Sequence, residues 1–359
     1  MILLVKKVVM HMRLSTIEKS YINTSGKIYD SEFINLANIK DNKIALDGRT
    51  LFLTKTEKET LNNQEIQNFN DAVYIFKYKN AYGIICDIPI KEYNDGKIKC
   101  HEVVLPDTIQ GMSSNLHGYN CEAAPVLLAH EKKVNYLYYT KEKKYTDYFI
   151  LDDMEIYVFC GKEAQKITDE FIEIDKLYVA DGHHRLYTTS LSKFKNSVLS
   201  CLISFEYLNI LPIHRIIPNL DIQLVKRAKD FIYSRFEVLP AETPLSKGRI
   251  RIKYREDSFV VNLIELNSDA FWNNDSYRLN TQIISQAFRI FDTGKLRYIS
   301  DCESKKYEIL LDKNDVLIET YPIEIDEFIE YANNECIMPP KSTWFSPKFP
   351  SFLIFKQYK

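Results

Sequence analysis

Two β-rich runs stand almost back to back in the first third of the chain. AVYIFKYK at residues 72–79 and YGIICDIPI at residues 82–90 are rich in β-branched and aromatic side chains, and only Asn80-Ala81 separates them. Such runs around a short connection are typical of a β-hairpin. Further strand patterns and separate helical patterns follow, so we predict an α+β protein with mixed sheets and flanking helices.

The pattern changes near residue 218. DIQLVKRAKDFIYSRF then predicts an amphipathic helix, and RIRIKYREDSFVVNLIEL predicts a second hairpin. A chain of 359 residues is also longer than one core usually serves. We therefore predict two domains, 1–218 and 219–359, the second an α/β domain that ends in a PPKST loop and a last strand.

Several shorter elements are predicted from local patterns. Residues 1–14 predict a first strand, and a helix is expected to begin at His101-Glu102. Residues 211–215, with His214 and Arg215, are read as a loop that lies either near a functional site or simply at a loop end. The other predicted elements are strands at 127–139, 148–159, 176–180 and 197–208, and helices at 165–174 and 186–194.

Composition narrows the function classes. The formal net charge is −2, which argues against a wide nucleic-acid surface, and no helix-turn-helix signature stands out. Seven cysteines occur singly without a CxxC pair, so we expect a reduced, cytoplasmic chain rather than a disulfide framework or zinc ribbon. No run approaches the roughly 18 apolar residues of a membrane span. Neither GxxxxGK[ST] nor GxGxxG is present.

The segment LYVADGHHRLYTTSLSKF at residues 177–194 carries the strongest functional pattern. A strand that stops at Asp181-Gly182 and gives way to a helix places backbone N–H groups and the positive helix end at one turn, which suits an anion. His183, His184 and Arg185 add donors, and Arg suits a forked grip on phosphate. The alternatives are a simple helix cap and a zinc site, although consecutive helical histidines point about 100° apart.

Two other segments carry candidate side chains. Glu102 could accept a proton from a hydroxyl, or could merely sit in a first helical turn, and His101 beside it is a candidate structural donor. Lys341, Ser342 and Thr343 present a cation and two hydroxyls from a loop that Pro339-Pro340 restrains. That loop could close over a carboxylate or phosphate, or be an exposed turn before the last strand.

These segments together resemble a known family. LYVADGHHR, KCHEVVLP and MPPKSTWFSPKFPSFLIF, with AVYIFKYKNAYGIICDIPIKEYNDGKIKCHE, resemble the domain of unknown function 1015 family in form and order. That family is similar to the ParB-like free-serine kinases, whose phosphate-binding turn has the same DGHHR form. The resemblance spans about residues 72–355 and implies a ParB-like nucleotide-binding core within 1–218. The first 70 residues lack the family's PPYD segment.

The resemblance implies a phosphotransferase that moves a phosphoryl group from ADP or ATP to the hydroxyl of a small molecule, free serine being the best single candidate. Mg²⁺ would be bound mainly through nucleotide phosphates, with no dedicated metal ligand in the chain. The implied residues are Glu102, Asp181 and His183 for catalysis, Gly182, His184 and Arg185 for phosphate, and Lys341, Ser342 and Thr343 for substrate.

Two other functions stay open. ParB-like domains also bind nucleotides to control a clamp, so a nucleotide-dependent switch or DNA-partner protein is the main alternative. The atypical first 70 residues keep a non-catalytic small-molecule binding module open as well.

Overall fold

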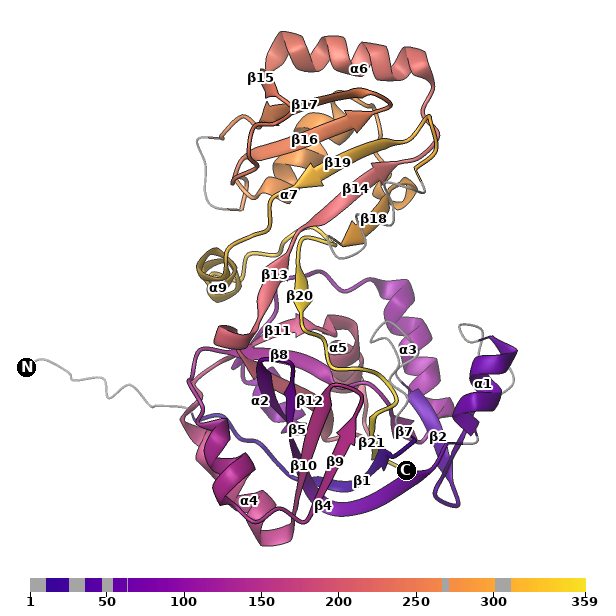
Figure 1. Ribbon diagram of the computed structural model, residues 1–359, viewed down its shortest axis with the longest axis vertical. Coiled ribbons are helices and arrows are strands. Elements are labelled where there is room, and N and C mark those ends of the chain that lie inside the picture. The colour runs from indigo at the N-terminus through magenta and orange to yellow at the C-terminus, as the bar shows by residue number, and fades with distance from the viewer. Residues whose placement is uncertain (1–10, 26–35, 47–53, 63, 267–270, 301–310) are drawn as a thin grey trace, which may run out of the picture. The chain divides into compact units, whose positions relative to one another are not determined.

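The computed structural model describes residues 11–25, 36–46, 54–62, 64–266, 271–300 and 311–359. The chain divides into two compact units (Figure 1). Unit 1 comprises residues 1–100, 104–208 and 347–359, and unit 2 comprises 101–103 and 209–346. The predicted domains, 1–218 and 219–359, remain a prediction, and these units differ from them. Residues 347–359 belong to unit 1 because the last strand pairs with the first one.

Unit 1 is built on one mixed sheet. Its order is β3-β2-β7-β21-β1-β4-β5-β12-β8-β11-β6, with β10 and β9 continuing from β4. Most neighbours are antiparallel, whereas β12–β8 and β11–β6 are parallel. The strands are β1 Ile17–Asn23, β2 Leu36–Lys40, β3 Lys43–Ala45, β4 Ile66–Tyr78, β5 Ala81–Pro89, β6 Ile98–Lys99, β7 Cys121–Glu122, β8 Val126–His130, β9 Asp147–Leu151, β10 Met154–Cys160, β11 Leu177–Asp181, β12 Ser197–Ser204 and β21 Ile354–Gln357.

Helices flank this sheet, as Figure 1 shows. α3 and α5 lie against each other, and α4 contacts β4 and β10. The helices are α1 Lys55–Asn62, α2 Ile90–Asn94, α3 Pro106–Gly118, α4 Gly161–Glu170 and α5 His183–Leu191, with short turns η1 Tyr138–Glu142, η2 Phe171–Glu173 and η3 Phe205–Tyr207. Their apolar faces and the sheet bury a core that includes Ile84, Val126, Ile167, Leu186 and Leu202.

Unit 2 has a smaller antiparallel sheet, β15-β17-β16-β19-β14-β18, and a two-stranded piece, β13-β20. α6 buries Val225, Ala228 and Ile232, the apolar stripe predicted for this helix, in the same core as sheet residues Ile252 and Val261. The elements are β13 Asn209–Leu211, β14 Ile213–Ile217, α6 Ile222–Arg235, β15 Glu237–Pro240, β16 Arg249–Tyr254, β17 Asp257–Asn262, α7 Asp275–Arg278, η4 Leu279–Ser285, η5 Thr293–Lys295, β18 Arg297–Ser300, β19 Val316–Thr320, α9 Ile325–Asn333 and β20 Trp344–Ser346.

The predicted α+β class with mixed sheets is confirmed, as are both hairpins, β4–β5 and β16–β17. The helix expected at His101-Glu102 is wrong, because these residues are extended and α3 begins at Pro106. Proline disfavours the helical conformation of Leu105 but suits the first helical position, so the helix starts there.

Other predicted elements also need correction. The strand predicted at 148–159 is two strands, β9 and β10, with a turn at 152–153, and the strand predicted at 197–208 ends at Ser204. The strand predicted at 127–139 ends at His130, and a π-helical turn occupies Tyr138–Glu142. Residues 211–215 are not a loop, because β13 ends at Leu211 and β14 begins at Ile213. β14 is buried along its whole length, so its histidine and arginine are inside the unit rather than on a surface loop.

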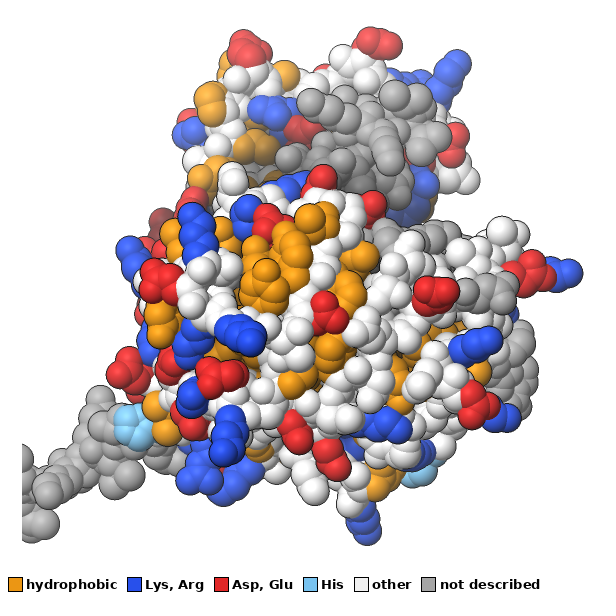
Figure 2. All heavy atoms as spheres, turned by 60° about the horizontal axis from the view of Figure 1, so that its bottom comes forward, with side chains coloured by type: hydrophobic (Ala, Val, Ile, Leu, Met, Phe, Trp, Pro, Cys, Tyr) orange, Lys and Arg blue, Asp and Glu red, His pale blue; other side chains and the backbone are white. Residues whose placement is uncertain are grey.

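The first ten residues, on which the predicted first strand depends, lie outside the described residues, and 11–14 are not in a strand. Among the six cysteines that the structure describes, none pairs with another in a disulfide. Where the structure describes the chain, no helix has both the length and the apolar composition needed to cross a membrane. On the face that Figure 2 shows, acidic and basic side chains are interspersed around hydrophobic ones.

Candidate functional site

The DGHHR turn of unit 1 joins a buried strand to a helix. β11 is buried from Leu177 to Ala180 and lies between β8 and β6. Gly182 then precedes α5 with a φ of +97°, a left-handed conformation that glycine adopts readily. A Cβ at this position would lie 3.0 Å from Nη2 of Arg185. Backbone conformation and the nearby guanidinium therefore both favour glycine here.

Asp181 is held between two cations. Nζ of Lys348 lies 3.0 Å from Oδ1, and Nη2 of Arg185 lies 2.5 Å from Oδ2. Burial opposes ionisation of the carboxyl group, but Lys348 and Arg185 outweigh it, so the pKa of Asp181 is below its ordinary value. Asp181 is therefore a carboxylate at neutral pH, with each oxygen accepting from one cation.

The Arg185 side chain makes hydrogen bonds within unit 1 itself. Besides Asp181, its guanidinium donates through Nη1 to the carbonyl oxygens of Ala124 (3.0 Å) and Pro125 (2.7 Å). The side chain thus ties the turn to the segment that enters β8. Its predicted grip on phosphate stays a prediction, and any such contact would use donors left by these three bonds.

The two histidines differ in environment. His183 is 6% exposed, and burial lowers its pKa to about 4 despite the nearby Asp181. It is therefore a neutral imidazole at pH 7, which can donate one hydrogen bond and accept one. His184 accepts a hydrogen bond at Nε2 from the backbone N–H of Leu105 (3.0 Å). Leu105 is the residue before α3, so the start of that helix is fastened to the turn.

The extended residues His101 and Glu102 are paired within unit 2. The N–H of Met338 donates to the carbonyl of His101 (2.7 Å), and Glu102 forms a parallel bridge with Met338. The His101 ring packs edge-on against Phe328, and its Nε2 lies 3.0 Å from Oγ1 of Thr343. His101 is 1% exposed, and its role as a structural donor stays a prediction.

Hydrogen bonds of its own hydroxyl groups stabilise the PPKST loop. Oγ of Ser342 donates to the carbonyl of Pro339 (2.6 Å), and Thr343 meets His101, so both hydroxyls help to shape the loop. Lys341 is exposed and has a φ of +61°, which is unusual for a residue other than glycine. The substrate-binding roles predicted for these residues stay predictions.

Arg215 supports this loop from β14. It is 2% exposed, and it donates to the carbonyl of Ile213 (2.6 Å), to Oγ of Ser276 (3.1 Å) and to the carbonyl of Lys341 (3.5 Å). Burial lowers its pKa to about 10, so it remains charged at neutral pH. Arg215 is therefore a positioning group that holds a carbonyl oxygen of the PPKST loop. Sequence analysis had predicted that Arg215 itself lies in a loop.

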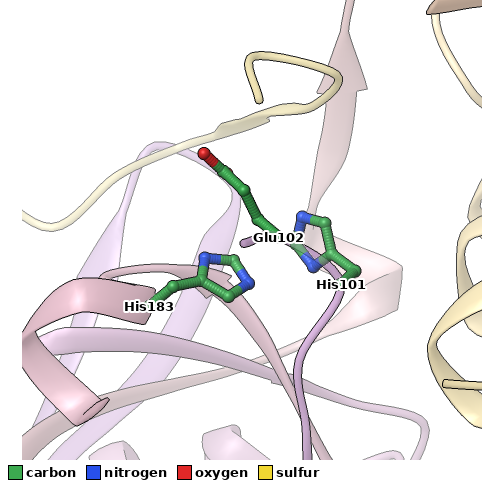
Figure 3. Close-up of side chains that lie close together, drawn as sticks. All are labelled: His101, Glu102 and His183. Atoms are coloured by element: carbon green, nitrogen blue, oxygen red, sulfur yellow. The ribbon is translucent and has the colours of Figure 1, made fainter. Parts of the chain in front are cut away.

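The structure thus groups the predicted residues in two sets. Unit 1 brings together Asp181, Gly182, His183, His184 and Arg185, and unit 2 holds Glu102 with the PPKST loop. Figure 3 shows His101 and Glu102 on the extended stretch after β6 and His183 in the first turn of α5.

Chain connectivity links the two sets. Lys99 pairs with Tyr178 of β11, and Leu105 donates to His184, so the stretch between them is fastened to unit 1 at both ends. Glu102 is three residues from Leu105, which limits the separation of their Cα atoms to about 11 Å.

Sequence analysis did not predict the ion pair of Lys348 with Asp181. Lys348 lies in SPKFP, seven residues after the lysine of PPKST within the same C-terminal segment. The strand patterns gave no indication that residues 347–359 return to unit 1, so nothing placed this lysine beside Asp181.

Residues 49–293, more than half of the chain, match the model of the family described as "Protein of unknown function (DUF1015)". No curated protein matches the chain. Among solved structures, it is similar to SbnI with a C-terminal truncation from Staphylococcus aureus, with 12% identity, a TM-score of 0.44, and coverage of 74% of this chain and 85% of that one.

Two further structures show a comparable likeness. A free serine kinase mutant in complex with ADP has 16% identity and a TM-score of 0.42, with coverage of 74% of this chain and 88% of that chain. A conserved hypothetical protein from Pyrococcus furiosus has 17% identity and a TM-score of 0.41, with coverage of 74% and 93%. Likeness at this level carries no argument about activity.

Proposed function

The chain belongs to the DUF1015 family, and we propose that it is a phosphotransferase that moves a phosphoryl group from ADP or ATP to the hydroxyl of a small molecule, most simply free serine. The observation that carries the proposal is the DGHHR turn. The left-handed glycine and the doubly paired aspartate precede α5, and the two histidines are its first residues. The first N–H groups of α5 and the positive end of the helix suit phosphate oxygens.

Phosphoryl transfer asks a protein chiefly for positioning and for stabilisation of charge. Lys348 supports this role, because its ion pair with Asp181 holds an ammonium beside the turn. His183 can donate one hydrogen bond as a neutral imidazole, and His184 can donate through Nδ1 while Nε2 accepts from Leu105. The binding of a polyphosphate would draw on these donors together.

Glu102 is proposed as the general base. A carboxylate within hydrogen-bond reach of an alcohol can take up its proton during transfer. The residue is only partly exposed, and its backbone is fixed by the bridge with Met338. Glu102 is three residues before Leu105, whose N–H donates to His184 of the turn.

Mg²⁺ would supply charge neutralisation when it enters with the nucleotide. Asp181 offers a hard oxygen donor, but both of its oxygens accept from cations. The carboxylate therefore fits the orientation of Lys348 and Arg185 better than direct coordination of a metal ion. We propose that Mg²⁺ is bound mainly through nucleotide phosphates.

The proposal is tested by incubating the full chain with Mg²⁺, isotopically labelled ADP or ATP, and a pool of free amino acids. We expect phosphoserine, and we expect Glu102→Gln to lower its rate by roughly 10²- to 10⁴-fold, the usual contribution of a general base. Glu206→Gln, which changes an exposed glutamate of unit 1, is the matched control and should keep full activity. Unchanged turnover in the Glu102 variant would remove this residue as the base.

One observation favours a second function, a binding module without turnover. The guanidinium of Arg185 donates hydrogen bonds to Asp181, Ala124 and Pro125, which leaves fewer donors for a transferred phosphoryl group. Nucleotide binding without phosphorylated product, for any acceptor in the pool, would favour the module. Hydrolysis that requires DNA would favour a nucleotide-dependent switch.

A further inference from the structure

Unit 2 contains a cavity of about 180 Å³ between α6 and the sheet. α6 contributes one wall, and β16, β17 and the start of β19 contribute the opposite one. Figure 1 shows α6 running alongside these strands. None of the lining residues belongs to the DGHHR turn, the His101-Glu102 stretch or the PPKST loop, so the cavity is independent of the proposed function.

The cavity walls are mainly apolar. They include Val225 and Ile232 of α6, Ile252 and Phe259 of the sheet, and Phe288. Protein interiors are close-packed, and voids larger than a water molecule are few. An apolar cavity of about 150 Å³ stays dry and takes up a molecule of the size of benzene. Size and lining therefore suit one compact apolar group rather than water.

A π-helical segment places one of the walls. Phe288 follows η4, and its N–H donates to the carbonyl of Ile283 (3.0 Å), five residues earlier. The same spacing occurs between the N–H of Gln286 and the carbonyl of Thr281 (3.2 Å). Wide turns of this kind are rare in proteins overall, and those that occur are often found at functional sites. Phe288, which follows this segment, is buried in the unit 2 core and also lines the cavity.

Polar side chains also line the cavity, namely Lys226, Lys229, Tyr254 and Asp257. Lys226 is exposed, and Lys229 forms an ion pair with Asp257, so the three side chains carry a net positive charge. The hydroxyl of Tyr254 is buried and has no hydrogen-bond partner among the described residues. A ligand with an anionic oxygen could satisfy both the lysine and this hydroxyl, because a carboxylate accepts from each.

We propose that this cavity binds a small monocarboxylic acid with an aromatic or branched apolar body. The apolar body fills the space between α6 and the sheet, and the carboxylate lies toward Lys226 and the hydroxyl of Tyr254. The chemistry of the site determines both parts, since apolar walls select the body and the lysines select the charge.

Phenylacetate and its uncharged analogue toluene are suitable probes, and titration of the full chain by calorimetry or ligand-observed NMR measures their binding. We expect phenylacetate to bind with a Kd no weaker than on the order of 10 mM. Lys226→Gln should weaken phenylacetate about two- to fivefold, the usual range for a partly exposed ion pair, and leave toluene unchanged. Lys313→Gln removes another exposed lysine of unit 2 and should change neither.

Val225→Phe fills the cavity and should abolish binding of both probes. Val316→Leu, a smaller change on the facing strand, should weaken both if the phenylalanine variant does not fold, as judged by thermal melting. Absence of binding by both probes to the wild type would overturn the proposal. It would also fail if phenylacetate bound the folded, filled variant as well as the wild type, or if Lys226→Gln weakened both probes equally.

Discussion

At the scale of single residues, Gly182 is the position where the turn depends most on side-chain size. We predict that Gly182→Ala lowers the free energy of unfolding by about 1–3 kcal/mol, because alanine at a φ of +97° is strained. The new Cβ would also displace the Arg185 guanidinium, so ADP affinity should fall about tenfold. Urea unfolding and calorimetric titration measure the two effects.

Gly96 provides the matched control for this change. It also has a positive φ, +75°, but a Cβ there would meet no atom within 4 Å. Gly96→Ala should therefore share the loss of stability and keep the affinity for ADP. Equal loss of ADP affinity in the two variants would show that the effect on binding is general rather than local to the turn.

Two buried histidines make stability depend on pH. Burial lowers the pKa of His130 and of His183 to about 4, whereas the pKa of an unfolded histidine is about 6.5. Between these values the unfolded state binds more protons, so stability is lost as pH falls from about 6.5. We predict that each histidine lowers the free energy of unfolding by about 2 kcal/mol when the pH falls from 7 to 5.

Urea unfolding of the wild type and of His130→Phe at these two pH values measures this effect. The variant should lose less stability on acidification, because phenylalanine does not titrate. Wild-type stability that stays constant from pH 7 to pH 5 would contradict the assignment of neutral, buried imidazoles.

At the scale of elements, the last strand is held by buried charges. Lys356 of β21 lies 2.8 Å from Asp87 of β5, and Glu122 of β7 pairs with Lys195 just before β12. Loss of one partner leaves a charge uncompensated in the interior. We predict that Lys356→Met lowers stability by about 3–5 kcal/mol, measured by denaturant unfolding. Lys162→Met changes an exposed lysine and should have little effect, and equal losses would argue against the buried network.

Sequence patterns predicted elements well where the alternation of side chains was regular. The hairpin β4–β5, the buried strand β11 and the amphipathic helix α6 all appear where they were expected. The pattern failed for His214 and Arg215, because two polar residues in a strand look like a loop unless their buried partners are known. It failed at His101-Glu102 because the pairing that extends this stretch comes from Met338, more than 200 residues away.

The residues of the DGHHR turn could be predicted from the sequence, but their contacts with distant residues could not. Asp181 to Arg185 could be identified from five consecutive letters, since a strand, a glycine and a helix define a turn locally. The contact with Lys348 depends on the return of the C-terminal segment to unit 1, which no local pattern records.

At the scale of the whole molecule, the chain passes between the units after Cys100, Val103, Leu208 and Ser346. These crossings leave short covalent segments between candidate residues of different units. Glu102 is three residues from Leu105, and Lys341 is seven residues from Lys348, which limits their Cα separation to about 25 Å.

The central claim is that the DGHHR turn binds a polyphosphate, and titration of the full chain with ADP, ATP and adenosine in the presence of Mg²⁺ tests it most directly. We predict that ADP and ATP bind at least about tenfold more tightly than adenosine, because the turn contacts the phosphates rather than the nucleoside. Equal affinity for adenosine, or no binding of either nucleotide, would contradict the account.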